Sequence, residues 1–474
     1  MQVLEKDPSA SWSSVGAVEF QVVLLAGGPG SRMSPLSTEI PKPLLPIANR
    51  PMISYQLEFL ERAGFSEVII VAQEEASSEL RSYVHEIYKG KVRVDWHFLA
   101  DTMGTAEALL QIKDKIKVLP SYAALATWAQ SVPSLTLALR AQTNFIVMSS
   151  DLVVDEKFLH GMADLHRLQD AMVTLLISRP KPVEGATGPV VDTKNEYGLM
   201  DYVGLKEDGE RLLYFKAAAD IENKMRISKK LLRKNYSLTI HTNLVDAHFY
   251  IFSKAALAML EARKEKIVSI KGELIPYLVR CQFRKAFTRE DAPIKRPFSK
   301  AYSMTSARVD TTDKIRCFAY TMEGGYCSRA NTIKSYVQMN LDIASRGACY
   351  SPLEPVTKNS YIHPAAVISP KTQVGAECVV GEGTRVGERA SIKKSVIGKH
   401  CVIHDGVKII NSVIMNHVTI SAGCVINGSV VCNNVYMKEK CNIKDSQIGV
   451  SYNVPEKTDI KNESLCRETE GMGI

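Results

Sequence analysis

The pattern of hydrophobic and polar positions divides the chain into two regions. In the first two thirds, short apolar runs alternate with amphipathic ones, as the strands and helices of an α/β protein do. The predicted strands are Glu19–Ala26, Val68–Ala72, Val92–Phe98 and Phe145–Ser149, and the predicted helices are Met52–Ala63 and Ser77–Tyr88. This alternation predicts a Rossmann-like, mainly parallel sheet with helices on both faces.

The final third of the chain follows a different rule. Between Ile362 and Ile448 an aliphatic residue recurs first every six positions and then in units of 17 residues. The six-residue recurrence comprises Ile362, Ile368, Val374, Val380, Val386 and Ile392. The 17-residue copies are Ser395-Val396-Ile397, Ser412-Val413-Ile414, Ser429-Val430-Val431 and Ser446-Gln447-Ile448. This hexapeptide pattern predicts a left-handed parallel β-helix, whose coils bury their aliphatic side chains against one another.

The same repeat predicts the environment of two cysteines and of several polar residues. Cys424 and Cys441 stand one period apart, which favours small side chains stacked in the core over a disulfide or a metal pair. Polar residues such as Asn411 are expected at the corners or on the outer faces of the coils.

Together the two patterns predict two domains and two tails. The predicted boundaries are 1–18 for a flexible N-terminal tail, 19–345 for the α/β domain, 355–450 for the β-helix and 451–474 for a C-terminal tail. Within the α/β domain we expect a surface insertion at 120–142 and a basic loop at 286–314. A charge-rich loop of this kind fits simple solvation and also fits contact with an acidic partner.

Composition narrows the class of protein. The chain has 474 residues, 45% of them hydrophobic, which is enough apolar material for at least two cores. A net charge of +8 over this length does not point to nucleic acid as a partner. Residues 1–18 lack the apolar core of a secretory signal, and the apolar stretch at 122–139 is too interrupted to span a membrane. Ten cysteines without paired spacing fit a cytosolic chain.

The motif that carries chemistry follows the first predicted strand. The apolar run ends in Ala26-Gly27-Gly28-Pro29-Gly30-Ser31-Arg32, and Pro41-Lys42-Pro43-Leu44-Leu45-Pro46 comes shortly after it. Glycines let backbone N–H groups turn toward phosphate oxygens, while Arg32 supplies a planar fork of donors and Lys42 a point charge. Because ligands of parallel α/β sheets bind beyond the carboxyl ends of the strands, this loop is a candidate phosphate site. A purely structural turn is the alternative.

The full string resembles the N-terminal signature of the sugar nucleotidyltransferases, the NDP-sugar pyrophosphorylases. Gly104-Thr105-Ala106 resembles the segment that opens a helix beside the nucleotide base in that family, and Asp151 stands where the family holds a Mg²⁺ ligand. The resemblance implies a nucleotidyltransferase-like fold with a nucleotide site. The residues it assigns to that site are Ala26, Gly27, Gly28, Gly30, Ser31, Arg32, Lys42, Gly104 and Thr105, with Asp151 as a vestigial metal ligand.

Three elements of that family's chemistry are missing. Arg329 falls about where the second Mg²⁺-binding aspartate is expected, and a guanidinium repels the cation. The Glu-Lys-Pro segment that holds the sugar phosphate corresponds to Phe215-Lys216-Ala217, which keeps only the lysine. His248 replaces the glycine of an Asn-Ala-Gly segment and would obstruct the approach of a sugar. A working nucleotidyltransferase and a non-catalytic relic both fit the fold, and these losses favour the relic.

Three other segments carry a closer resemblance. Ile240–His248, Glu273–Phe283 and Ser391–Gly398 are similar to segments of the gamma subunits of eukaryotic translation initiation factor 2B, and the likeness runs from about Phe20 to Ile448. It implies a regulatory and structural subunit of a guanine-nucleotide exchange factor that reloads initiation factor 2. In that family the exchange-catalysing helical domain follows the β-helix of the epsilon subunit, and residues 451–474 leave no room for it.

The resemblance also implies what the chain binds. It implies no catalytic residue, no metal and no cofactor beyond weak nucleotide binding. The implied partners are the epsilon subunit, the other subunits of the factor and initiation factor 2 as the substrate GTPase, in the cytosol, without membrane or direct nucleic-acid contact. The alternative is an active sugar-1-phosphate nucleotidyltransferase similar to GDP-mannose pyrophosphorylase.

Overall fold

The computed structural model contains two compact units. The residues that it describes are 20–28, 30–100, 103–116, 144–179, 200–221, 225–234, 237–283, 315–346 and 360–466. We call Met1–Gly28, Gln56–Lys181 and Lys194–Cys327 the sheet unit, and Pro29–Tyr55, Pro182–Thr193 and Ser328–Ile474 the β-helix unit. The predicted tail at 1–18, the 120–142 insertion and the 286–314 loop lie outside the described residues.

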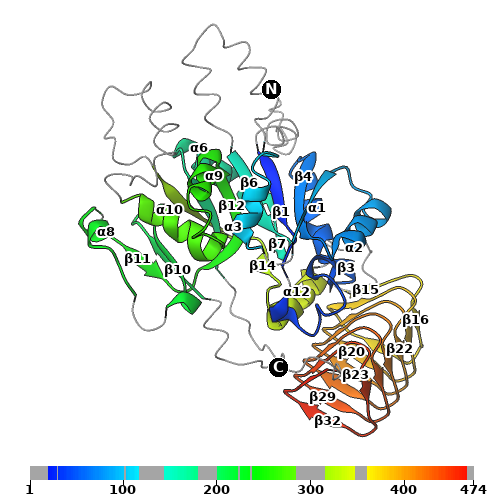
Figure 1. Cartoon of the computed structure of the whole chain (residues 1–474). Coiled ribbons are helices and arrows are strands. Elements are labelled where there is room, and N and C mark those ends of the chain that lie inside the picture. Colours follow the sequence, from blue (N-terminus) through cyan, green and yellow to red (C-terminus); the bar gives the residue numbers. More distant parts are fainter. Residues whose placement is uncertain are drawn as a thin grey trace, which may run out of the picture. The chain divides into compact units, whose positions relative to one another are not determined.

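A seven-stranded sheet forms the centre of the sheet unit, in the order β13-β8-β12-β6-β1-β4-β5 (Figure 1). Its strands are β1 (Gln21–Leu25), β4 (Glu67–Gln73), β5 (Arg93–Leu99), β6 (Asn144–Ser149), β8 (Val173–Ser178), β12 (Val245–Ser253) and β13 (Cys317–Thr321). Strand β12 runs antiparallel to its neighbours β6 and β8, and the other pairs are parallel. The predicted mainly parallel sheet is therefore confirmed.

Aromatic and aliphatic side chains pack helices onto both faces of this sheet. The helices are α1 (Met52–Arg62), α2 (Ser77–Ser82), α3 (Thr105–Gln111), α6 (Leu159–Leu168), α9 (Lys254–Glu261) and α10 (Ile275–Cys281). Phe249 of β12 meets Phe59 of α1 edge to face, while the next residue, Tyr250, enters the core shared with α3, α9 and α10. The predicted helix at 77–88 is confirmed, although its second half, η5 (Tyr83–Ile87), is π-helical. None of the described helices combines the length and the apolar content that crossing a bilayer requires.

A smaller antiparallel sheet in the order β10-β9-β11 completes the sheet unit. It comprises β9 (Asp201–Leu205), β10 (Leu212–Ala217) and β11 (Thr239–His241). Helix α8 (Lys229–Lys234) precedes β11 in the chain, and the π-helical turn η9 (Ile270–Leu274) leads directly into α10. The amide of Gln282, just after α10, donates to Leu212 O at 2.8 Å and accepts from Cys317 N at 3.2 Å. That buried side chain ties the small sheet to the large one.

The β-helix unit contains three parallel sheets of seven, six and six strands, which form the sides of stacked coils (Figure 1). The first sheet consists of β15 (Ser360–Ile362), β18 (Cys378–Val380), β21 (Val396–Ile397), β24 (Val413–Ile414), β27 (Val430–Val431), β30 (Gln447–Ile448) and β33 (Ser464–Leu465). The second consists of β16 (Val367–Ile368), β19 (Arg385–Val386), β22 (Val402–Ile403), β25 (Thr419–Ile420), β28 (Tyr436–Met437) and β31 (Asn453–Val454). The third consists of β17 (Gln373–Val374), β20 (Ser391–Lys393), β23 (Lys408–Ile410), β26 (Val425–Asn427), β29 (Asn442–Lys444) and β32 (Asp459–Lys461).

Strand register reproduces the repeat seen in the sequence. Ile362 pairs with Val380, 18 residues on, and from there Val380 pairs with Ile397 and Ile397 with Ile414, at 17-residue steps. The inward side chains form one core that includes Cys424 and Cys441, which are 0% and 1% exposed. Both cysteines are free thiols, as the stacking argument predicts.

The corners of the coils need a left-handed backbone. One corner repeats at 17-residue steps with positive φ at Glu377, Lys394, Asn411, Gly428, Asp445 and Asn462. Asn411, with φ of +48°, thus lies at a corner, where the sequence places it. Most of these residues are not glycine, so packing of the coils offsets a local cost of about 1–2 kcal/mol at each non-glycine corner.

The predicted end of the β-helix at residue 450 is wrong. Strands β31, β32 and β33 form one more coil that ends at Leu465, so most of the predicted C-terminal tail at 451–474 belongs to the repeat. Aliphatic residues still recur at the inward positions of that coil, at Val454, Ile460 and Leu465. Its copy of the serine triplet is Glu463-Ser464-Leu465, which hides the repeat because Glu463 replaces the leading serine.

Helix α12 (Ile333–Arg346) lies on the first sheet of the β-helix, against β15, β18 and β21. A hairpin of two short strands, β2 (Pro46–Ile47) and β3 (Arg50–Pro51), contacts this helix. Ala48 N donates to Asn340 Oδ1 of α12 at 2.9 Å, and Asn49 Nδ2 donates to Ile397 O of the β-helix at 2.7 Å. The segment that carries Lys42 is therefore anchored to the β-helix unit.

A column of buried serines links successive coils. Ser412 Oγ donates to Ile410 O at 2.7 Å and accepts from Ser429 N at 3.2 Å, and Ser395, Ser429 and Ser446 repeat both contacts. All four serines are 0% exposed. Each hydroxyl therefore satisfies a backbone N–H that no water reaches.

Ser412→Ala should lower the free energy of unfolding of the chain by about 1–2 kcal/mol, because it leaves the Ser429 N–H buried without an acceptor. Urea unfolding followed by circular dichroism measures the change. The control is Ser421→Ala, just after β25, which removes a hydroxyl that forms no hydrogen bond with a described residue and should change stability by less than about 0.5 kcal/mol. Equal losses in the two variants would contradict the role of the column.

Candidate functional site

The predicted glycine loop begins at the carboxyl end of β1. Ala26 is buried and its N–H donates to Val71 O at 2.7 Å, which prolongs the pairing of β1 with β4. Gly27 and Gly28 are exposed, and Gly28 has φ of +130°, a conformation that residues with a side chain rarely adopt. The first part of the loop is therefore a turn that depends on glycine.

The second part of the loop belongs to the β-helix unit. Gly30 has φ of +63°, and its carbonyl accepts from Met33 N at 2.7 Å and from Ser37 Oγ at 2.9 Å. Ser31 and Arg32 are exposed in the short helix η3 (Ser31–Met33). Among the described residues the Arg32 guanidinium has no hydrogen-bond or ion-pair partner, which leaves it accessible to an anion.

Lys42 opens another short helix, η4 (Lys42–Leu44), and is half-buried. It has an interaction within the protein, so it is less accessible than Arg32. The predicted phosphate residues are thus divided, with Ala26, Gly27 and Gly28 in one unit and Gly30, Ser31, Arg32 and Lys42 in the other.

Gly104 and Thr105 are already engaged within the sheet unit. A β-carbon on Gly104 would lie 2.3 Å from Val268 Cγ1, so Val268 fills the space on that side of the glycine. Gly104 N donates to Glu107 Oε2 at 2.7 Å, and Thr105 Oγ1 accepts from Ile270 N at 2.9 Å. This segment opens α3, as predicted, and its polar groups are used by the protein.

Asp151 follows β6 and is 1% exposed. The preceding residue, Ser150, donates its N–H to Leu25 O at 3.0 Å, which fixes this turn beside the end of β1. Asp151 has an interaction within the protein, and its role as a vestigial Mg²⁺ ligand stays a prediction. Arg329 ends β14 (Cys327–Arg329) in the β-helix unit, and its predicted position near Asp151 stays a prediction.

A cluster of charged residues that sequence reasoning missed lies in the sheet unit. Asp201, at the start of β9, is 1% exposed, and its Oδ2 accepts from Lys271 Nζ at 2.9 Å and from Asp246 N at 3.0 Å. Lys271 belongs to η9 and Asp246 to β12, so one carboxylate joins three elements. Asp201 Oδ1 is buried and has no hydrogen-bond partner in the described part of the chain. No repeat or motif marks Asp201 or Lys271 in the sequence, whereas Asp246 belongs to the segment that corresponds to Asn-Ala-Gly.

His248 stands at the edge of this cluster, in a bulge of β12. Its φ is +54°, and the pairing of β12 with β8 shifts register between Asp246 and Tyr250. The His248 N–H donates to Asp246 Oδ1 at 3.0 Å, and its Nε2 lies 3.6 Å from Asp246 Oδ2. The backbone at His248 thus has the left-handed conformation that favours glycine, although the residue carries an imidazole.

Lys216 lacks the surroundings expected of the lysine that holds the sugar phosphate. It lies near the end of β10, half-buried and opposite Tyr202 of β9. It forms no ion pair with another described residue, whereas Lys271 does. The loss of the Glu-Lys-Pro context therefore leaves a lysine without the acidic neighbour that the motif supplies.

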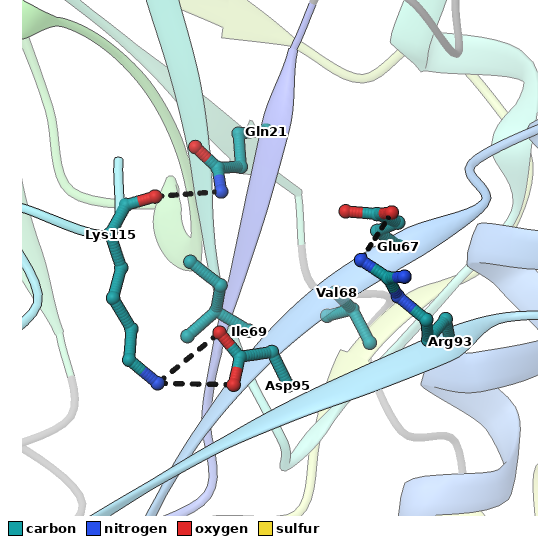
Figure 2. Close-up of a pocket in the computed structure, with 7 residues that line it drawn as sticks. All are labelled: Gln21, Glu67, Val68, Ile69, Arg93, Asp95 and Lys115. Carbon is teal, nitrogen blue, oxygen red and sulfur yellow. Dashed lines mark hydrogen bonds and ion pairs between the residues drawn. The ribbon is translucent and has the colours of Figure 1, made fainter. Parts of the chain in front are cut away.

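A cavity of about 380 Å³ lies at the other end of the strands (Figure 2). It is lined by Gln21, Glu67, Val68, Ile69, Arg93, Asp95 and Lys115, three of which open β1, β4 and β5. Its charges satisfy one another, since Arg93 pairs with Glu67 at 2.7 Å and Lys115 with Asp95 at 3.0 Å. This cavity is therefore separate from the glycine loop and has no unpaired charge to offer a nucleotide.

Lys271→Met should lower the free energy of unfolding by about 2–3 kcal/mol, because it strands the buried Asp201 carboxylate without its cation. Chemical unfolding of the full chain measures the loss. The matched control is Lys113→Met, whose 2.5 Å pair with Glu261 is largely exposed and should change the free energy of unfolding much less than the Lys271 variant does. Adding Asp201→Asn to Lys271→Met should recover part of the stability, and a further loss in that double variant would refute the pairing argument.

Comparisons with known proteins cover both units. Residues 21–188 match the model of the nucleotidyl transferase family, and residues 357–461 match the model of the left-handed β-helix described as the EIF2B subunit epsilon LbH domain. The nucleotidyltransferase-like fold followed by a left-handed parallel β-helix is therefore confirmed.

Curated relatives identify the family. Translation initiation factor eIF2B subunit gamma of Dictyostelium discoideum is 39% identical over 414 residues, which are 81% of this chain and 88% of the relative. The protein of the same name from Schizosaccharomyces pombe is 31% identical over 79% of this chain and 74% of its own length. Mannose-1-phosphate guanyltransferase of Candida albicans is more distant, at 24% identity over 54% of this chain and 55% of the relative. The chain belongs to the family of eIF2B gamma subunits.

Proposed function

We propose that the chain is a non-catalytic gamma subunit of the eIF2B guanine-nucleotide exchange complex in the cytosol. In this role it pairs with the epsilon subunit, assembles with the other subunits and promotes the exchange of GDP for GTP on initiation factor 2. One observation carries the proposal: identity to named gamma subunits is 39% and 31% over 81% and 79% of the chain, whereas identity to guanylyltransferases is 22–25%, even where the likeness covers 82% of the chain.

The condition of the ancestral site supports a non-catalytic role. Joining a nucleoside triphosphate to a sugar phosphate requires Mg²⁺ and basic groups that hold the charge developing on phosphate. Asp151 is buried, Val268 fills the space beside Gly104, and the imidazole of His248 replaces a glycine. Arg329, where a second metal-binding aspartate is expected, adds a charge of the wrong sign.

The glycine loop supports a second, weaker activity. Gly28 and Gly30 keep φ values of +130° and +63°, and Arg32 is exposed without a described partner. These features suit weak binding of a nucleotide or another anion. The same features favour the alternative, an active sugar-1-phosphate nucleotidyltransferase. Nucleotidyltransferase activity therefore has to be measured directly.

Adding the purified chain to the epsilon subunit should raise the rate of GDP release from initiation factor 2 several-fold, because the chain acts by assembling with epsilon. Release of a fluorescent GDP analogue measures the rate. Arg32→Ala is the control, since a loop that does no chemistry should leave the stimulation unchanged. No stimulation by the unmodified chain would overturn the proposal.

The chain alone should release no pyrophosphate from GTP and mannose-1-phosphate in the presence of Mg²⁺. A coupled pyrophosphate assay at high protein concentration tests this, with an active guanyltransferase as the positive control. The reason is that the sequence has Arg329 where the second metal-binding aspartate is expected, and Phe215-Lys216-Ala217 where the sugar-phosphate lysine motif is expected. Turnover that depends on Arg32 would establish the nucleotidyltransferase alternative instead.

A further inference from the structure

The segment around helix α8 carries most of the net positive charge of the chain. Between Asn223 and Val245 the sequence has no aspartate or glutamate, and it has six cationic residues, Lys224, Arg226, Lys229, Lys230, Arg233 and Lys234. The net charge of the whole chain is +8, so this short segment accounts for six of the eight net charges. Helix α8 lies at the margin of the sheet unit (Figure 1).

Apolar side chains hold this segment on the small sheet. Leu231 of α8 is 3% exposed and packs with Leu213 of β10 and with Phe283, which follows α10. Ile227 and Leu238, on either side of α8 in the chain, pack against the same cluster. The position of α8 is therefore set by packing, and its charged residues take no part in that packing.

The cations of this segment are exposed and unpaired. We call Arg226, Lys229, Lys230 and Arg233 the α8 basic cluster. All four are exposed, and none forms an ion pair with another described residue. Like charges three and four residues apart repel each other on a helix, so Lys229, Lys230 and Arg233 weaken α8. A bound anion would remove this repulsion.

The acids nearest in the chain do not neutralise the cluster. The exposed acids described between residues 200 and 245 are Asp220 and, in the turn between β9 and β10, Glu207, Asp208 and Glu210. Asp208 is engaged within that turn, where its Oδ2 lies 3.7 Å from Lys206 Nζ and its Oδ1 accepts from Arg211 N at 3.1 Å. None of these acids forms an ion pair with the α8 basic cluster. The cluster thus presents unbalanced positive charge to solvent.

Leu232 distinguishes between two kinds of anionic partner. It is 51% exposed and lies in the chain between Lys230 and Arg233. Proteins that bind single-stranded nucleic acid stack the bases on aromatic side chains, and residues 225–234 contain no aromatic residue. An acidic polypeptide suits the surface better, because its carboxylates match the cations and an apolar side chain beside them covers Leu232.

We propose that the α8 basic cluster docks an acidic segment of a companion subunit. Carboxylates of that segment pair with Lys229, Lys230 and Arg233, and an apolar side chain packs on Leu232. The inference rests on the proposed function, since it takes the partner to be another subunit of the same complex.

Cross-linking in the assembled complex tests where the partner lies. The full chain is co-expressed with its companion subunits and carries the photoreactive residue p-benzoyl-phenylalanine in place of Leu232 or, as the control, in place of the exposed Leu168 on α6. We expect Leu232→p-benzoyl-phenylalanine to cross-link a companion subunit at a segment with Asp or Glu next to an apolar residue. The absence of a cross-link, or a cross-link to RNA or to a segment without acidic residues, would overturn the proposal.

Charge reversal measures what the cluster contributes to assembly. Lys229→Glu combined with Arg233→Glu should weaken the association with the companion subunits by about tenfold. The matched control is Lys264→Glu combined with Lys266→Glu, which makes the same change of charge at two exposed lysines after α9 and should leave association unchanged.

Charge removal separates docking from folding. Lys229→Gln combined with Arg233→Gln should weaken association in the same direction without lowering the melting temperature, because the two cations repel each other in the free chain. A lower melting temperature with unchanged association would assign the cations to folding and overturn the proposal.

The remaining outcomes separate this inference from the proposed function. If the unmodified chain fails to assemble with the companion subunits, the proposed function fails. If it assembles, but the Glu and Gln variants of Lys229 and Arg233 bind as tightly as the unmodified chain, only the docking site is refuted. Nuclease treatment should leave the complex intact, and weaker association after that treatment would identify RNA as the occupant and refute the acidic segment.

Discussion

The β-helix unit depends on one constraint: every 17th residue has to suit the same place in the next coil. Ile397, Ile414 and Val431 meet it in the core, and the serine column meets it at a backbone N–H that water cannot reach. The outward Val396 is also buried, at 2% exposed, on a strand that contacts α12. The first sheet is therefore packed on both faces. Among the described elements, α12 and the hairpin after the glycine loop pack against the β-helix.

The same platform explains why the loop can keep its shape without keeping its chemistry. Asn49 and Ala48 are held by the β-helix and by α12, so the chain that follows the loop is fixed by contacts unrelated to any ligand. On the sheet unit, Ala26 is fixed by pairing with Val71. A loop that is held at both ends retains a tight turn, and the turn needs glycine at φ values such as +63° whether or not phosphate binds.

Elements whose hydrophobic residues repeat or alternate can be predicted from the sequence. Contacts between residues far apart in the chain, which follow no such pattern, cannot. The β-helix, β1 and α1 follow from periodic burial. The last coil was missed because Glu463 replaces the serine that begins each earlier triplet, although Val454 and Ile460 keep the period. The ion pair of Lys271 with Asp201 joins residues 70 positions apart, and neither has a neighbour that marks it. Filling of the space beside Gly104 by Val268 is equally invisible, because it depends on tertiary packing.

These facts limit what a nucleotide-binding signature proves. A glycine with positive φ is retained for the backbone, so the string from Ala26 to Arg32 is evidence of the fold. Catalysis depends on side chains, which the backbone does not require in this way, and at those positions the chain differs from the nucleotidyltransferase motifs. It has a histidine in a left-handed bulge, a lysine without its acidic neighbour and an arginine where an acid is expected. His248 illustrates the distinction, since its backbone has a left-handed conformation that favours glycine while its imidazole lies against Asp246.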